Sequence, residues 1–277
     1  VSTHLPVSRY LKHFEGAGHR FVLGSNLLKG RMGPRSRQWD VGLATASLIG
    51  PVVLLGVGWW QYSDPIRPLS RLVYGKVLSR EYRHSVRDGL TESRLKALGF
   101  SNVLNTACPS MWDLTPEHCV KIPAERADVV VTTITDYNRH AHRDRHMLQV
   151  LKRNYREVHV WLQGLGDERY LNELLVGGPN LRVVGPALAD FDRLLEDEVD
   201  YVGTRLHAGI RALQKGRRSL IVSVDNRAEE LHRDFGLPIL SLGSMDSWES
   251  QIRTNFETCL RLPEENIRLW RGQYGLA

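Results

Sequence analysis

The sequence predicts an α/β protein built from two doubly wound domains with parallel sheets. Short apolar runs rich in β-branched residues recur along the 277 residues, and most intervals between them are long enough for a helix. The runs are apolar throughout, which is typical of parallel strands covered on both faces. The length exceeds that of a usual single core, so two domains are expected.

The first half contains four expected strands, at residues 21–23, 52–57, 84–86 and 103–106. The uncharged span 41–63 is long enough for a membrane helix, but Gly50-Pro51 divides it. We therefore expect a buried helix ending near Ile49 and then a strand. Thr91 is expected to cap a helix that ends at Gly99, and Thr115-Pro116 predicts another helix start.

A second series of strands begins after the irregular stretch 119–126. Its expected strands are 129–134, 158–162, 181–184, 199–202 and 220–224. We expect an N-terminal Rossmann-like domain over residues 1–122 and a C-terminal one over 123–246. One long helix is expected over about 247–271. Two such domains facing a cleft form a glycosyltransferase-B-like architecture.

Composition narrows the class of protein. The formal charge of +6 favours anionic ligands, but the basic residues are dispersed, which argues against nucleic-acid binding. Three cysteines without a CxxC pair indicate a reducing compartment, and the amino terminus does not resemble a signal peptide. A cytoplasmic protein is expected. His140, His142 and His146 lie among arginines that would repel a cation, so no metal site is expected.

The segment 200–210 carries the strongest functional signal. A β-prone run stops at Gly203, and a helix pattern follows with Thr204 as its expected cap. Arg205 and His207 lie at this junction, where open α/β sheets bind ligands and a helix start favours anions. Arg205 would bind a phosphate or carboxylate, and His207 would carry a proton.

Several other residues follow expected strands and are candidates for the cleft. They are Gln163 with Asp167, Asp225 with Asn226, and Trp59. Trp59 could instead be a core aromatic residue. Neither a GxGxxG nor a GxxxxGK[ST] motif is present, so no nicotinamide cofactor or P-loop nucleotide is expected.

The chain resembles the polysaccharide pyruvyl transferase family over about residues 20–238. The blocks that carry the resemblance are, in order, Gly24-Ser-Asn-Leu-Leu28, Pro51-Val-Val-Leu-Leu-Gly-Val-Gly58, Ser85-Val-Arg-Asp88 with Glu92-Ser93, Cys108-Pro109, and Arg205-Leu206-His207 followed by the strand 219–224 and Asp225. One feature differs. Nothing before His19 matches the Gly-Asn-x-Gly-Asp loop that usually follows the first strand in this family.

The resemblance implies transfer of the enolpyruvyl group of phosphoenolpyruvate onto a sugar diol as a ketal, in exopolysaccharide or cell-envelope synthesis. It implies catalysis by His207 and Arg205, with the donor bound by Arg87, Arg205, Leu206, Asn26 and Gly58. No separate cofactor is implied. The acceptor would be a sugar or a lipid-linked saccharide, met in the cytoplasm or at the inner membrane face. The segment 247–277 would pack back on the first domain.

Two alternatives remain open on the sequence. A glycosyltransferase of the same architecture would use a nucleotide sugar, although no nucleotide motif supports it. A non-catalytic protein that binds anions or glycans would keep the fold without the paired Arg and His chemistry. No general base for the sugar hydroxyl can be identified.

Overall fold

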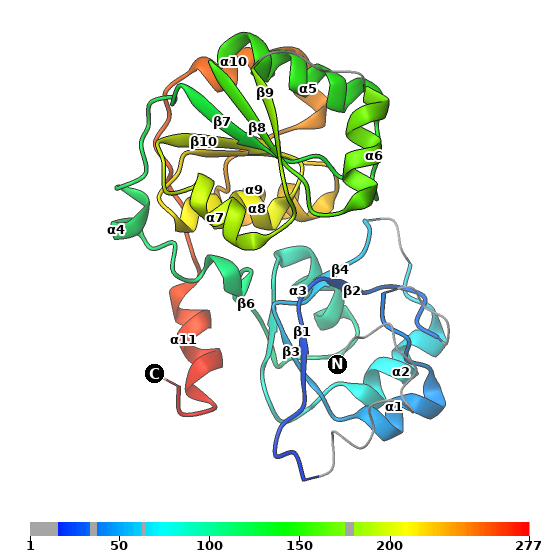
Figure 1. Cartoon of the computed structure of the whole chain (residues 1–277). Coiled ribbons are helices and arrows are strands. Elements are labelled where there is room, and N and C mark those ends of the chain that lie inside the picture. Colours follow the sequence, from blue (N-terminus) through cyan, green and yellow to red (C-terminus); the bar gives the residue numbers. More distant parts are fainter. Residues whose placement is uncertain (1–15, 34–37, 63–64, 175–179, 277) are drawn as a thin grey trace. The chain divides into compact units, whose positions relative to one another are not determined.

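The computed structural model describes residues 16–33, 38–62, 65–174 and 180–276 (Figure 1). These residues form two compact units. Unit 1 falls within Val1–Trp112 and Leu262–Ala277, and unit 2 is Asp113–Arg261. None of the helices in the described residues is long and apolar enough to cross a membrane.

Unit 1 contains short parallel strands that pair in twos. Strand β1 (Phe21–Leu23) pairs with β3 (Val53–Leu55), β2 (Asn26–Leu28) with β4 (Gly58–Trp59), and β5 (His84–Val86) with β6 (Val103–Asn105). A bridge between Val57 and Val86 continues the pairing from the β3–β4 segment to β5. The expected strand 52–57 is thus interrupted at Gly56. This glycine has a φ of +63°, and a Cβ there would collide with Pro109.

The helices of unit 1 are α1 (Leu43–Ile49), α2 (Pro68–Val77), α3 (Gly89–Ala97) and α11 (Glu264–Gly272), with a 3₁₀ turn η3 (Pro109–Met111). The expected helix end at Ile49 is confirmed. The expected cap at Thr91 is wrong, because α3 begins earlier. Its N-cap is Asp88, whose carboxylate accepts hydrogen bonds from both the backbone N and the hydroxyl of Thr91.

His84 is a fully buried polar residue of β5 in unit 1. Its Nδ1 accepts a hydrogen bond from the backbone N of Leu54 at 3.1 Å, so Nε2 carries the proton and donates to the Ser79 carbonyl at 2.9 Å. Burial lowers the pKa of His84 to about 4. The imidazole is therefore neutral at physiological pH and links β5 to β3.

Unit 2 is organised around a six-stranded parallel sheet in the order β12-β11-β10-β7-β8-β9. The strands are β7 (Val129–Thr132), β8 (Glu157–Trp161), β9 (Leu181–Val184), β10 (Val199–Gly203), β11 (Ser219–Val222) and β12 (Ile239–Leu240). The chain runs outward from β7 to β9, returns to the other side of β7 with β10, and continues to β12. The strand order is that of a Rossmann sheet, and its direction reverses between β7 and β10. That topological switch point is where sheets of this kind bind ligands.

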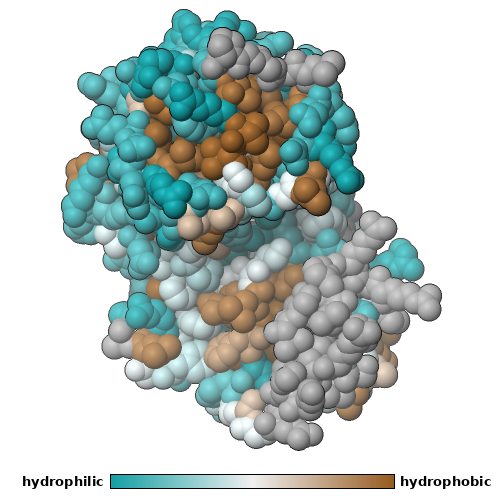
Figure 2. Space-filling view, viewed as in Figure 1, coloured by the Kyte–Doolittle hydropathy of each residue, from teal (hydrophilic) through white to brown (hydrophobic). Residues whose placement is uncertain are grey.

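Helices cover both faces of the sheet of unit 2. The helices of unit 2 are α4 (Pro116–Cys119), α5 (Ala141–Asn154), α6 (Leu165–Leu174), α7 (Leu188–Leu194), α8 (Leu206–Gln214), α9 (Asn226–Phe235) and α10 (Trp248–Arg253), with the 3₁₀ segment η4 (Leu242–Ser247). Helices α5 and α10 lie on one side, and α8 and α9 on the other (Figure 1). Val183 of the edge strand β9 is 54% exposed, and Figure 2 shows apolar surface in this part of unit 2.

The single long helix expected over 247–271 is wrong. Helix α10 ends at Arg253, and α11 begins only at Glu264, after Pro263. The guanidinium of the buried Arg218 donates to the carbonyls of Ile252 and Thr254 at 2.9 and 3.0 Å, which satisfies the end of α10. The apolar Phe256 then packs under Arg218 from an extended segment, with its ring centroid 4.5 Å from the guanidinium carbon.

Candidate functional site

At the junction after β10, Thr204 forms hydrogen bonds to Thr133, the residue that follows β7. The backbone N and the hydroxyl of Thr204 both donate to the Thr133 carbonyl at 3.1 Å. The expected helix cap at Thr204 is therefore wrong. Its hydroxyl binds the Thr133 carbonyl, and Arg205 is the N-cap of α8. Gly203 permits this close approach, since a Cβ there would lie 2.6 Å from the backbone N of Thr133. Arg205 thus lies at the switch point.

Arg205 is held by protein groups on most of its guanidinium. Its Nη2 lies 2.7 Å from both carboxylate oxygens of Asp167, and its Nε donates to the Ile134 carbonyl at 3.2 Å. The ring of Tyr137 lies 5.2 Å from the guanidinium carbon. Nη1 donates no hydrogen bond to the residues that the structure describes, and the side chain as a whole is 18% exposed. Of the three guanidinium nitrogens, Nη1 is therefore the one whose N–H groups remain for a ligand.

His207 follows in the first turn of α8 and is exposed. Leu206 between them is buried, so it contributes packing and a backbone N–H at the start of the helix. The structure thus brings Arg205 and His207 to one helix start, as the sequence predicts for this pair of residues. An exposed imidazole beside a fixed guanidinium can exchange a proton with a bound anion.

Asp225 and Asn226 lie at the neighbouring start of α9, after β11. The Asp225 carboxylate caps α9 by accepting from the backbone N of Arg227 at 3.0 Å, and it also forms an ion pair with the Arg227 guanidinium. Arg227 in turn donates to the Tyr137 hydroxyl at 2.8 Å. Asp225 is consequently engaged by Arg227, while Asn226 is the first residue of the helix.

Tyr137 and Arg227 are two residues of this edge that the sequence reasoning missed. The Tyr137 ring lies 5.2 Å from the Arg205 guanidinium and 5.9 Å from that of Arg227, and it is 56% exposed. Their positions in the sequence could have indicated them, because each follows a strand by a few residues. Tyr137 follows β7, and Arg227 follows β11. Gln163, which follows β8, is exposed, and its backbone N donates to Asp167 at 3.0 Å.

Three residues predicted to bind the donor come together in unit 1. The Arg87 guanidinium donates to the Asn26 side-chain oxygen, and both side chains are buried. A Cβ at Gly58 would collide with the same two groups, so only glycine fits there. Asp88 lies 3.7 Å from the Nε of Arg87. The first residues of β2 and β4 therefore meet the residue that follows β5 and hold its guanidinium in a fixed position.

Trp59 belongs to the hydrophobic core of unit 1. Its side chain is fully buried, and its ring centroid lies 6.2 Å from that of Tyr74. The neighbouring aromatic residues Trp60 and Tyr62 are 40% and 45% exposed. If an aromatic side chain of this segment contacts a sugar, the exposed pair is better placed than Trp59.

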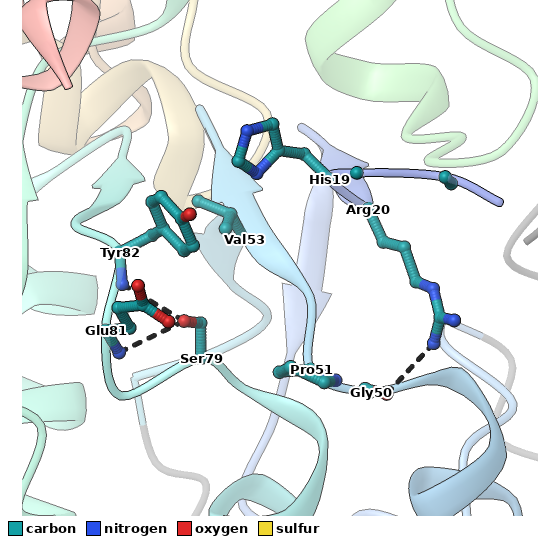
Figure 3. Close-up of a pocket in the computed structure, with 10 residues that line it drawn as sticks. His19, Arg20, Gly50, Pro51, Val53, Ser79, Glu81 and Tyr82 are labelled. Atoms are coloured by element: carbon teal, nitrogen blue, oxygen red, sulfur yellow. Dashed lines mark hydrogen bonds between the residues drawn. The ribbon is translucent and has the colours of Figure 1, made fainter. Parts of the chain in front are cut away.

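A pocket of about 240 Å³ in unit 1 lies away from the residues predicted for the site (Figure 3). Its lining includes His19, Arg20, Pro51, Ser79 and Tyr82, which precede β1, β3 and β5. It therefore lies at the amino ends of these parallel strands, whereas Arg87 follows the carboxyl end of β5. Within the described part of the chain, no three His, Cys, Asp or Glu side chains gather closely enough to hold a metal ion.

Comparison with known families gives one match. The model of the family described as polysaccharide pyruvyl transferase matches residues 21–226, which is most of the chain. The matched span contains Asn26, Gly58 and Arg87 of unit 1 as well as Arg205 and His207 of unit 2. No curated protein matches the chain. The chain therefore belongs to the polysaccharide pyruvyl transferase family and is a transferase.

Proposed function

We propose that this protein transfers the enolpyruvyl group of phosphoenolpyruvate to two hydroxyls of a saccharide and forms a cyclic ketal. The observation that carries the proposal is the geometry at the switch point of unit 2. There, Asp167 fixes the Arg205 guanidinium, and Nη1 of this guanidinium remains for a ligand. His207, two residues later, is exposed at the start of α8. This combination suits a small ligand that carries several negative charges and must also receive a proton.

The donor has two anionic ends, a phosphate and a carboxylate. In this proposal Arg205 binds one end through Nη1, together with the first N–H groups of α8. Arg87, oriented by Asn26, is proposed to bind the other end. Gly58 supports Arg87 by leaving room for its guanidinium.

The chemistry proceeds by addition and then substitution at C2 of the donor. His207, as imidazolium, protonates the methylene carbon, which becomes the methyl group of the product. A sugar hydroxyl forms a bond to C2 and loses its proton. The C2–O bond to phosphate then breaks, and the second hydroxyl closes the ketal with loss of its proton. Phosphoenolpyruvate and a diol thus give a ketal and inorganic phosphate, while the arginines stabilise the charge on the leaving phosphate.

The proposed acceptor is a sugar diol of a polysaccharide or of its lipid-linked precursor, and the proposed setting is the cytoplasm or the inner membrane face. Membership of the family supports a saccharide acceptor. In the described part of the chain, no disulfide joins Cys108, Cys119 or Cys259, which is typical of a reducing compartment. No separate cofactor takes part in this scheme, because the donor supplies the transferred group.

Thermal stabilisation by ligands tests the proposed donor. Phosphoenolpyruvate at about 100 times its dissociation constant would stabilise the folded protein by about 2.7 kcal/mol. We expect a rise in melting temperature with phosphoenolpyruvate and none with UDP- or GDP-sugars at the same concentration. A rise with a nucleotide sugar and none with phosphoenolpyruvate would reject the proposal and favour a glycosyltransferase.

A further inference from the structure

The Asp167 carboxylate connects three loops at the switch point of unit 2. It lies in the first turn of α6, where the helix start favours a negative charge, and its side chain is 1% exposed. Besides Nη2 of Arg205, it accepts hydrogen bonds from the backbone N of Asp136 at 3.1 Å and of Gln163 at 3.0 Å. These donors come from the loops that follow β7, β8 and β10.

We propose that Asp167 is a positioning residue that fixes the Arg205 guanidinium so that Nη1 faces the donor. This inference rests on the proposed function. The arginine side chain has several rotatable bonds, and immobilising such a side chain costs conformational entropy. Asp167 and the Ile134 carbonyl make the fixing contacts before a ligand arrives. The guanidinium is then pre-organised for the donor.

The surroundings of Asp167 fit positioning better than direct contact with a ligand. Its oxygens are buried and already accept hydrogen bonds from Asp136, Gln163 and Arg205, so they are not offered to a substrate. A carboxylate would also repel an anionic donor. Any effect of Asp167 on donor binding must therefore depend on Arg205, and this dependence is a measurable signature of positioning.

A double-mutant cycle measures that signature. The variants are Asp167→Asn, Arg205→Ala and the double variant, and the measurement is the dissociation constant of phosphoenolpyruvate by calorimetry. We expect Asp167→Asn to weaken donor binding about 10-fold in the natural background and less than about 2-fold when Arg205 is alanine. A residue that only stabilised the loops would cause the same loss in both backgrounds.

The matched control is Asp192→Asn, because Asp192 forms a similar paired contact with Arg211 at 2.9 and 2.8 Å in the same unit. It should leave donor binding unchanged. Asp167→Glu guards against a variant that does not fold, since it keeps the charge but moves the carboxylate by one methylene. We expect it to weaken donor binding about as much as Asp167→Asn.

The outcomes separate the inference from the proposed function. If the natural protein does not bind phosphoenolpyruvate, the proposed function is wrong and this inference is wrong with it. If the natural protein binds the donor but Asp167→Asn and Asp167→Glu bind it equally well, only the inference is overturned. Equal losses in both Arg205 backgrounds would also overturn it, because they would assign Asp167 a structural role alone.

Discussion

Replacing Arg205 with alanine should cause two losses that can be measured separately. The first is stability. Arg205→Ala leaves the Asp167 carboxylate, 1% exposed, with only its two backbone donors. Removing one partner of a fully buried ion pair costs about 3–5 kcal/mol. Because Arg205 is 18% exposed and Asp167 keeps two hydrogen bonds, we expect a loss of about 2 kcal/mol in the free energy of unfolding.

The second loss is donor affinity. Arg205→Ala removes the charge-assisted hydrogen bond that Nη1 would make to phosphoenolpyruvate, which should cost about 1.5–3 kcal/mol. This corresponds to a dissociation constant about 10- to 150-fold higher. Arg205→Lys should restore only part of either quantity, because one ammonium group cannot contact Asp167, the Ile134 carbonyl and the donor together.

Denaturant unfolding and calorimetric titration with phosphoenolpyruvate measure the two losses. Arg211→Ala is the matched control, since the Arg211–Asp192 pair lies in the same unit and is more exposed. It should cost less than about 1 kcal/mol of stability and leave donor affinity unchanged. Unchanged donor affinity in Arg205→Ala would place the anion site elsewhere and refute the reasoning. Unchanged stability would show that the Asp167 contact is not formed in solution.

Three further outcomes are expected. His207→Ala should lower turnover by at least roughly 10²-fold with little effect on donor affinity, and full activity in a phosphate-release assay would remove His207 from the mechanism. Gly58→Ala should lower the free energy of unfolding by about 1–3 kcal/mol and weaken donor binding, because its Cβ collides with Arg87. Gly75→Ala, on an open helix surface, should not destabilise the protein, and equal unfolding curves for the two variants would contradict this. The pKa of His84 is about 4 when folded and 6.5 in its ordinary state, so the unfolded chain binds the extra proton between these values. Stability should therefore fall as pH drops from 6.5 to 4, and His84→Asn should flatten that slope in unfolding experiments at several pH values.

The sheet of unit 2 could be predicted from the sequence because its central strands β7, β10 and β11 are buried on both faces. The apolar run 158–162 corresponds to β8 at Glu157–Trp161, and the run 199–202 to β10 at Val199–Gly203. The candidate ligand-binding edge followed from the same information, since parallel strands place the residues after their carboxyl ends together. The positions of Arg205 and His207 at the start of α8 were predicted in this way.

Features set by long-range contacts could not be predicted. The helical pattern 247–271 has apolar residues at helical spacing, but Arg218 binds the end of α10 from a distant part of the sequence. Similarly, no local pattern shows that Asp167 binds Arg205 across 38 residues. The N-cap of α3 was predicted wrongly because Asp88 and Thr91 are both favourable N-cap residues. The helix uses Asp88, which lies three residues earlier.

The proposed reaction of this transferase is the formation of a ketal from phosphoenolpyruvate. Its most direct test is a reaction in D₂O with phosphoenolpyruvate and cell-envelope saccharides as acceptors, followed by mass spectrometry of the product and a phosphate assay. We expect one phosphate released for each pyruvyl group transferred and one deuterium in the new methyl group, because the methylene carbon takes its proton from an exchangeable donor. A product that retains the vinyl group without deuterium, or transfer of a sugar from a nucleotide donor instead, would contradict it.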